Sequence, residues 1–211
     1  MIPVPWKMFT YSLEDYPFPT WVARSLEVDN LTSLTADLQL NTWQTDQTSP
    51  WHGPFYASFG RWQDAYVDFL RDVVAPRFGE PVYYQRVPTF RVHLPGNLAV
   101  GEFHTDAQYH HPEDEVSFWL PLTPAYDTCS LWVADDDDAL RGVVARPGEV
   151  VEFSAAKRLH GNYVNQTGHS RVSFDFRCLP VRLLPDTEGP PTKHTGLRFV
   201  PGGYYAAEPI S

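Results

Sequence analysis

His104 and Asp106 are separated by a single residue, Thr105. Side chains alternate between the two faces of a strand, so in an extended segment this imidazole and carboxylate point to the same side and can reach one metal ion. His160 is the candidate for a third ligand, because four short predicted strands separate it from Asp106 and can bring the chain back beside its start in a rolled sheet. Two histidines and one carboxylate on one side of an ion leave the opposite positions open, as in non-haem Fe(II) oxygenases.

A second polar group lies on the strand predicted after His160. The face of this strand that begins with Arg171 is polar and the opposite face is apolar. The residues of the two faces are, respectively, Arg171, Ser173, Asp175, Arg177 and Val172, Phe174, Phe176, Cys178. If the apolar face packs on a neighbouring layer, the polar face lines a cavity. The planar guanidinium of Arg171 then points inward and can bind a carboxylate through two hydrogen bonds, and Ser173 can add a hydroxyl donor.

Longer motifs between about residues 80 and 180 carry the same pattern. They are Phe90-Arg91-Val92-His93-Leu94-Pro95-Gly96, Gly101-Glu102-Phe103-His104-Thr105-Asp106, Phe118-Trp119-Leu120-Pro121-Leu122-Thr123, His160-Gly161-Asn162 and Arg171-Val172-Ser173-Phe174-Asp175-Phe176-Arg177. Together with the spacing, these motifs resemble the Fe(II)/2-oxoglutarate-dependent dioxygenase superfamily, and more narrowly its streptomycin-biosynthesis StrG-type branch.

The resemblance implies a role for each residue of the constellation. His104, Asp106 and His160 would hold Fe(II), Arg171 would bind the distal carboxylate of the co-substrate 2-oxoglutarate with Ser173 beside it, and O₂ would be the oxidant. The carboxylate ligand Asp106 is present, so the resemblance favours hydroxylation, desaturation or ring closure over halogenation. It also implies a double-stranded β-helix as the fold.

Four further residues are candidate substrate contacts: Arg91, His110, Asn162 and Trp119. Each has an alternative interpretation. Arg91 can instead form a structural ion pair, for example with Asp175; Asn162 can form a turn; and Trp119 can belong to the core or the cavity wall. His110, next to His111 in a predicted loop at the mouth, could complete a local zinc site with His104 and Asp106. A zinc hydrolase and a cupin-like metal or small-molecule binding module without turnover are therefore the two alternative functions.

Twenty prolines and thirteen glycines divide the chain into short segments, which favours a mainly β fold. Leucines at positions 31, 34 and 38 predict an early helix, and apolar residues between Trp62 and Val74 predict a second. The predicted strands are Val82–Leu94, Ala99–Thr105, Glu115–Leu122, Ser130–Ala134, Glu149–Phe153 and Arg171–Leu179.

These elements predict a mainly β chain with flanking α-helices, arranged as a cupin-like jelly roll. We expect a single oxygenase domain over residues 1–211. It would consist of a helical or irregular N-terminal part (1–79), the jelly-roll core (about 80–180) and a C-terminal extension (181–211). Neither the first 75 residues nor the last 30 carry a motif with an assignable role.

The chain has a net charge of −10, from 26 acidic and 16 basic residues. An acidic chain gains nothing electrostatically from nucleic acid or from an anionic membrane, so neither is an expected partner. The two cysteines do not form a disulfide framework, which favours the cytoplasm. The expected partner is a small polar natural-product or amino-acid-derived substrate, and the acidic chain favours one that carries positive charge. The oligomeric state does not follow from the sequence.

Overall fold

The structure of the chain, a computed structural model, describes residues 4–185, 189–193 and 195–211. The remaining residues, 1–3, 186–188 and 194, belong to the predicted N-terminal part and C-terminal extension and lie outside the described residues. No helix in the described ranges is both long enough and apolar enough to cross a membrane.

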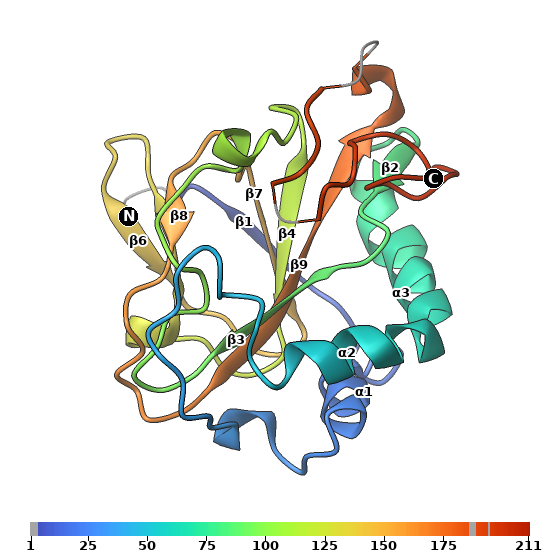
Figure 1. The fold of residues 1–211 in the computed structure, drawn as a ribbon. Helices are drawn as coiled ribbons and strands as arrows, with labels where there is room; N and C mark the ends of the chain where they lie inside the picture. Colours follow the sequence, from blue (N-terminus) through green and yellow to red (C-terminus); the bar gives the residue numbers. More distant parts are fainter. Residues whose placement is uncertain (1–3, 186–188, 194) are drawn as a thin grey trace.

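Two antiparallel sheets form the centre of the fold (Figure 1). The strands of the larger sheet are, in order, β1 (Lys7–Thr10), β7 (Glu149–Phe153), β4 (Val116–Pro121), β9 (Arg171–Pro180) and β2 (Val82–Tyr84), with β3 (Thr89–His93) also pairing with β9. The smaller sheet has the order β6 (Leu140–Val143), β5 (Leu131–Ala134), β8 (His160–Gly161). From β4 onward the chain passes back and forth between the sheets: β5 and β6 lie in the smaller sheet, β7 in the larger, β8 in the smaller and β9 in the larger. This mainly β arrangement is the predicted jelly roll.

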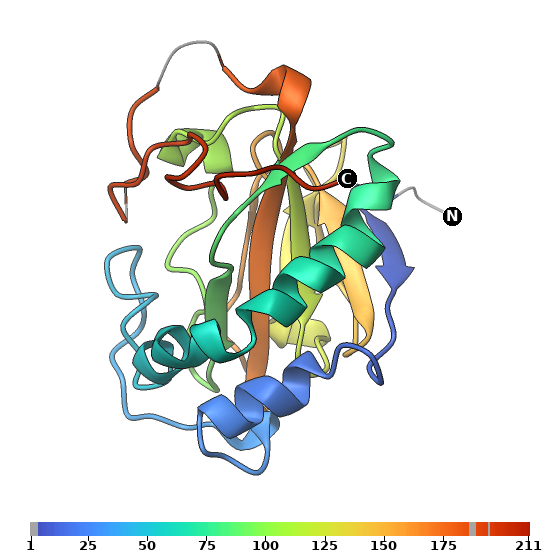
Figure 2. The same ribbon diagram turned by 90° about the vertical axis from the view of Figure 1, so that its right-hand side faces the viewer.

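Three α-helices cover the outer face of the larger sheet (Figure 2). They are α1 (Phe18–Ser25), α2 (His52–Ser58) and α3 (Gln63–Phe69), and a π-helical turn at Leu70–Val74 continues α3. Their apolar side chains meet the aromatic outer face of β9: the ring of Phe174 contacts Phe18 of α1 edge-on, with 5.3 Å between ring centroids. Burial of this face leaves the polar face of the sheet turned toward the second sheet, as predicted.

β9 is the central element because it pairs with three strands and all ten of its residues are buried. β2 and β3 pair with successive parts of it, so the predicted strand Val82–Leu94 is interrupted between Tyr84 and Thr89. Pro88 falls in this interruption, consistent with its lack of a backbone N–H for the ladder. The predicted strand Glu149–Phe153 and the start of β9 at Arg171 are confirmed.

Two predicted elements are wrong. The early helix is only a 3₁₀ turn at Leu31–Ser33, and Leu34 continues in an extended conformation, so the leucine spacing reflects packing of an irregular segment. No strand spans Ala99–Thr105; His104 makes an isolated bridge, and Asp106 opens a 3₁₀ helix, Asp106–Tyr109. Helices α1 and α2 were not predicted: both are short, and proline and glycine in their sequences obscure the helical pattern.

The buried His52 in α2 makes the core sensitive to acid. Its Nδ1 lies 2.7 Å from the Ser49 hydroxyl, and burial, helped by the charge of Arg91, lowers its pKa to about 4. In the unfolded chain this imidazole takes up a proton near pH 6.5, so the unfolded state binds more protons between pH 6.5 and 4. Stability therefore falls as the pH drops through this window.

The free energy of unfolding of the wild-type protein should fall when the pH is lowered from 7 to 5. We expect this fall to be smaller in His52→Leu by about 2 kcal/mol. Urea unfolding at both pH values measures this difference independently of any change in stability at pH 7. An unchanged pH dependence would contradict the assignment.

Candidate metal centre and its two cavities

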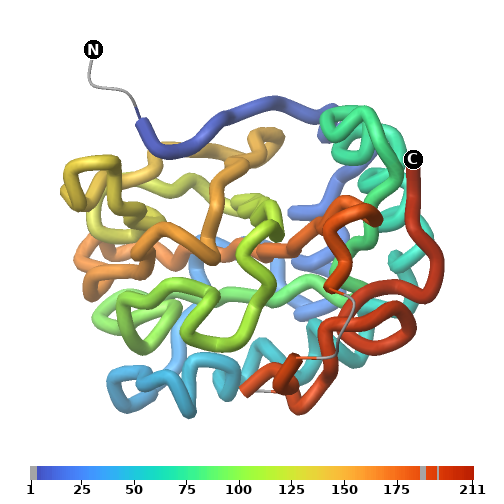
Figure 3. Tube along the Cα trace, turned by 90° about the horizontal axis from the view of Figure 1, so that it is seen from above, coloured from blue at the N-terminus to red at the C-terminus, as the bar shows by residue number. Residues whose placement is uncertain are grey.

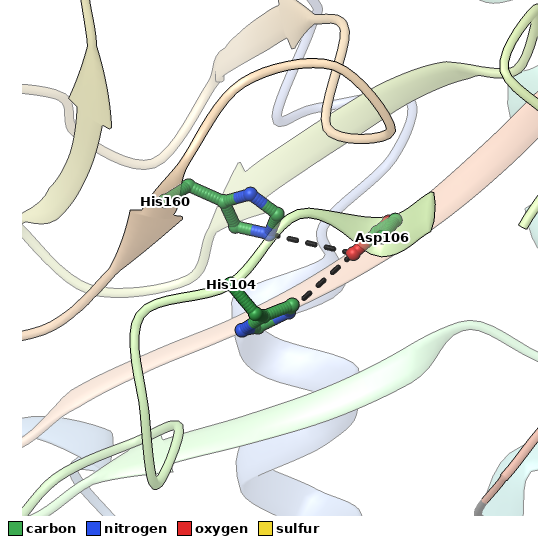
Figure 4. A group of neighbouring side chains, drawn as sticks. All are labelled: His104, Asp106 and His160. Carbon is green, nitrogen blue, oxygen red and sulfur yellow. Dashed lines mark ion pairs between the residues drawn. The ribbon is translucent and has the colours of Figure 1, made fainter. Parts of the chain in front are cut away.

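His104, Asp106 and His160 converge, although His160 lies 54 positions after Asp106 in the chain (Figure 4). Backbone bonds bring the histidines together: His104 N–H donates to the His160 carbonyl and His160 N–H to the His104 carbonyl, each at 2.9 Å. Directly opposed residues of such a pair place their side chains on one face. Asp106 is held from the other side, where its N–H donates to the Ala155 carbonyl at 2.9 Å.

The three side chains direct their donor atoms at a common point. The Nε2 atoms of His104 and His160 lie 3.4 and 3.5 Å from Asp106 Oδ1. The Nδ1 atom of each histidine lies within 3.0 Å of a backbone carbonyl, that of Glu102 or Arg158. A carbonyl only accepts hydrogen bonds, so Nδ1 carries the proton and the lone pair is on Nε2, facing Asp106. All three residues are buried.

The other carboxylate oxygen, Asp106 Oδ2, is already engaged. Arg177 donates to it from Nε at 3.0 Å and from Nη2 at 2.8 Å. Burial alone would raise the pKa of Asp106, but the charge of Arg177, with a smaller contribution from His111, holds it well below its usual range. Asp106 is therefore an anion with one oxygen left to face the two imidazoles.

An inner cavity extends from this group between the two sheets. Its lining includes His104, His160, Ser117, Trp119, Asn162 and Arg171. Arg171 is 1% exposed, and its guanidinium forms no ion pair with any described residue. It donates instead to neutral acceptors, the Cys129 carbonyl at 3.1 Å and the Ser173 hydroxyl at 2.8 Å. Burial lowers the pKa of Arg171 to about 10, so the group stays charged at neutral pH.

The lining of the inner cavity also holds polar atoms without a partner among the described residues. They are Ser117 Oγ and Asn162 Oδ1, both buried. Ser173 Oγ accepts from Arg171 and, at 3.0 Å, from Trp119 Nε1, so its own O–H remains free to donate. A cavity that offers a buried unpaired cation and several unsatisfied polar atoms is suited to a small anionic ligand.

An outer cavity of about 520 Å³ lies on the other side of the group, and His104, Arg91 and Arg177 line both cavities. Part of its wall comes from segments that carried no recognisable motif: Gln44 and Gln47 from the N-terminal part, and Thr192, Thr195 and Tyr204 from the C-terminal extension. Figure 3 shows these two segments along one side of the molecule. They supply mostly amide and hydroxyl groups to the cavity.

The candidate substrate contacts are distributed between these cavities. Arg91 lines both and also forms the predicted ion pair with Asp175, at 3.1 Å. Asn162 and Trp119 line the inner cavity. His110 lines neither: it is exposed, with a left-handed backbone (φ 74°) that ends the 3₁₀ helix. Its neighbour His111 lines the outer cavity instead, with Nδ1 2.7 Å from the buried Glu115.

Three residues with close contacts at the site were given no role from the sequence: Arg177, His111 and Tyr204. Arg177 lies on the polar face predicted for β9, and that face was the signal that could have identified it. His111 was considered together with His110 as a loop histidine at the mouth that could touch substrate, but only His110 was chosen as a candidate contact. Tyr204, whose hydroxyl donates to Gln85 Oε1 at 2.8 Å, lies in the extension and offered no pattern.

The N-terminal wall of the outer cavity is locked against the segment that leads to the metal group. A Cβ on Gly101 would lie 2.0 Å from the carbonyl carbon of Thr42, which real side chains do not tolerate. We expect Gly101→Ala to displace residues 41–47 and to increase their hydrogen exchange and protease sensitivity. Gly53→Ala is the control, because its Cβ would meet no atom within 4 Å. Equal exchange in the two variants would contradict the prediction.

Comparison with known proteins identifies one sequence relative. The streptomycin biosynthesis protein StrG of Streptomyces griseus is 38% identical over 170 residues, covering 81% of this chain and 82% of StrG. No family model matches the chain.

Two solved structures share the fold. EctD from S. alaskensis with bound Fe has a TM-score of 0.55 at 16% identity, over 87% of this chain and 75% of EctD. The non-haem monooxygenase ThoJ in complex with nickel has a TM-score of 0.51 at 14% identity, over 95% of this chain and 84% of ThoJ.

Proposed function

The chain belongs to the family of the streptomycin biosynthesis protein StrG, and on this basis we propose that it is a non-haem Fe(II)/2-oxoglutarate-dependent oxygenase. The observation that carries the proposal is the convergence of His104, Asp106 and His160 beside a cavity that contains the unpaired cation of Arg171. The fold shared with EctD and ThoJ, described with bound Fe and Ni, supports it.

The three residues fit an iron ion. Their donor atoms lie within 4.8 Å of one another, and two imidazoles with one carboxylate are the donor set that suits Fe(II) and leaves positions open. The carbonyl bonds to Nδ1 fix the tautomer and ring orientation of both histidines. When bound, the iron would supply the activation of O₂ needed to oxidise a C–H bond.

We assign 2-oxoglutarate to the inner cavity because of the chemistry of the residues that line it. We assign Arg171 to the distal carboxylate, because the charge would neutralise a guanidinium that otherwise stays buried and unpaired. The free O–H of Ser173, beside the guanidinium, could donate to the same carboxylate, and Trp119 holds Ser173 in place. Asn162 and Ser117 also line this cavity, and their unpaired Oδ1 and Oγ atoms would bind polar atoms of the ligand or its water.

We assign the substrate to the outer cavity. Its lining combines amide and hydroxyl groups with the guanidinium groups of Arg86, Arg91 and Arg177, which suits a small polar molecule with several hydrogen-bonding groups, such as an intermediate of natural-product biosynthesis. Among the described residues that line this cavity, Asp106 is the only one with a carboxylate, and it belongs to the metal group. The cavity therefore adds no support for a positively charged substrate. The proposed reaction is hydroxylation, desaturation or ring closure.

The test is to mix anaerobically purified protein with Fe(II) and 2-oxoglutarate, admit air and measure succinate. We expect succinate only when protein, metal and 2-oxoglutarate are all present, and more of it when a substrate from a panel of polar natural products is added. Protein with Ni(II) in place of Fe(II) is the matched control for background chemistry.

The alternative functions give different outcomes. A binding module without turnover would show neither succinate nor a rise in melting temperature with 2-oxoglutarate. A zinc hydrolase would retain zinc through chelator-free purification and would lose it in His110→Ala rather than His160→Ala. Either pattern would rule out the proposal.

A further inference from the structure

Arg177 makes two side-chain hydrogen bonds to the metal group. It is 5% exposed, and two of its N–H groups donate to one atom, Asp106 Oδ2. The third nitrogen, Nη1, donates to Asp175, and it lies 3.5 Å from Gln85 Oε1. The whole guanidinium is therefore fixed in orientation by partners on both sides.

The partners of Arg177 form a chain of alternating charges. Asp46 pairs with Arg91 at 3.4 Å, Arg91 with Asp175 at 3.1 Å, and Asp175 with Arg177, which ends at Asp106. The three carboxylates and two guanidiniums of this chain have a net charge of −1. This net negative charge would attract a divalent cation at the Asp106 end. The chain also explains how a buried arginine can lie near a cation site: Asp175 offsets its charge.

This arrangement limits what Asp106 can offer to a metal. Oδ2 accepts two hydrogen bonds from Arg177, and Oδ1 is the atom that faces the two Nε2 atoms. A carboxylate that turned to bind through both oxygens would have to give up both hydrogen bonds in a buried site, where an unmet guanidinium is costly.

We propose that Arg177 is the positioning residue of the metal centre: it restricts Asp106 to a single coordinating oxygen and so keeps a position open for the co-substrate or O₂. The inference rests on the proposed function, since it concerns the same metal group. A six-coordinate ion with three protein donors has three positions left, and a second oxygen from Asp106 would occupy one of them.

The experiment titrates metal-free protein with Co(II) and follows both affinity and the visible spectrum, which reports coordination number. Arg177→Lys keeps the charge but loses the two-pronged contact. We expect its Co(II) affinity to fall by about 10- to 100-fold, as for other residues that orient a ligand. We also expect its spectrum to shift toward a higher coordination number as Asp106 turns.

The chain offers a matched control. Arg77 donates from Nε and Nη2 to one oxygen of Glu152, at 3.0 and 2.7 Å, away from the metal group. Arg77→Lys removes the same kind of contact and should leave Co(II) affinity and spectrum unchanged. A wild-type affinity and spectrum in folded Arg177→Lys would overturn the inference, whereas failure of the wild-type protein itself to bind Co(II) would refute the proposed metal site.

A second variant covers the case in which Arg177→Lys does not fold. Asp175→Asn keeps the shape of the side chain but removes the charge that holds Nη1 of Arg177. We expect a smaller loss of Co(II) affinity with a spectral shift in the same direction. If Arg177→Lys is unfolded, unchanged Co(II) binding in folded Asp175→Asn overturns the inference.

Discussion

Asp106→Ala is expected to abolish Fe(II) binding and succinate formation. The substitution removes the carboxylate of the metal group and leaves the guanidinium of Arg177 facing the cation site, so attraction is replaced by repulsion. Loss of a residue that merely orients a ligand costs about 10- to 100-fold in metal affinity, so loss of the ligand itself should exceed about 100-fold. Anaerobic calorimetric titration with Fe(II) measures the affinity.

Asp114→Ala is the matched control, because it removes an exposed carboxylate whose salt bridge to Lys157 is long, at 3.7 Å, and exposed. It should bind Fe(II) like the wild-type protein. Asp106→Asn preserves the size of the side chain and an acceptor for Arg177, and it separates loss of the charge from loss of the fold. Iron binding at wild-type strength in folded Asp106→Ala would remove the basis of the oxygenase proposal.

Arg171→Met is expected to eliminate the response to 2-oxoglutarate while leaving the fold intact. Truncating one partner of a buried charge pair costs about 2–5 kcal/mol, which corresponds to a loss of affinity from about 30-fold to several thousand-fold. The free protein loses a buried cation that has no described carboxylate partner, so its melting temperature should change little even though neutral hydrogen bonds are lost.

The measurement is the rise in melting temperature with 2-oxoglutarate, in the presence of Ni(II) so that no turnover occurs. Arg171→Lys keeps the charge without the planar fork and should show an intermediate response. Arg182→Lys, at an exposed pair with Glu80, is the control. If Arg171→Met still responds to 2-oxoglutarate like the wild-type protein, Arg171 is not the residue that binds the carboxylate.

The polar and apolar faces of β9 were predictable because a strand has a side-chain period of two. The aromatic face packs on the helices and the face with Arg171 lines the cavities, as expected. The four strands between Asp106 and His160 were also expected, although β6 was not identified individually. These features depend on the alternation of polar and apolar residues along a strand and on the number of residues between Asp106 and His160. Both can be read directly from a single sequence.

The pairing of His104 with Asp106 was predicted correctly from an incorrect local structure. Alternation along a strand does not place them together, because Asp106 starts a 3₁₀ helix. His160 aligns His104 through the backbone, and the Ala155 carbonyl anchors Asp106. These are long-range contacts, and only the motif resemblance carried that information.

The choice of His110 over His111 as a substrate contact stays a prediction, although His110 is exposed and lines neither cavity. The left-handed backbone at His110 ends the 3₁₀ helix and sends the two neighbouring side chains to different environments. Nothing in the local residue pattern marks where such a turn occurs. The walls of the outer cavity were equally unpredictable, since they are irregular segments held by individual contacts such as that of Gly101 with Thr42.

The pairing of β9 with β3 and β4 has a consequence for how the protein must fold. Arg171, Ser173, Asp175 and Arg177 sit on this one strand, and a slip of one residue against its partners would exchange its two faces. Four polar side chains would then enter the aromatic layer, and four apolar ones would enter the site. Molecules misregistered in this way would lose the proposed co-substrate contact of Arg171 and the hydrogen bonds from Arg177 to Asp106 together. The fraction of active protein after refolding therefore measures the fraction of molecules in which β9 has paired with β3 and β4 in the correct register.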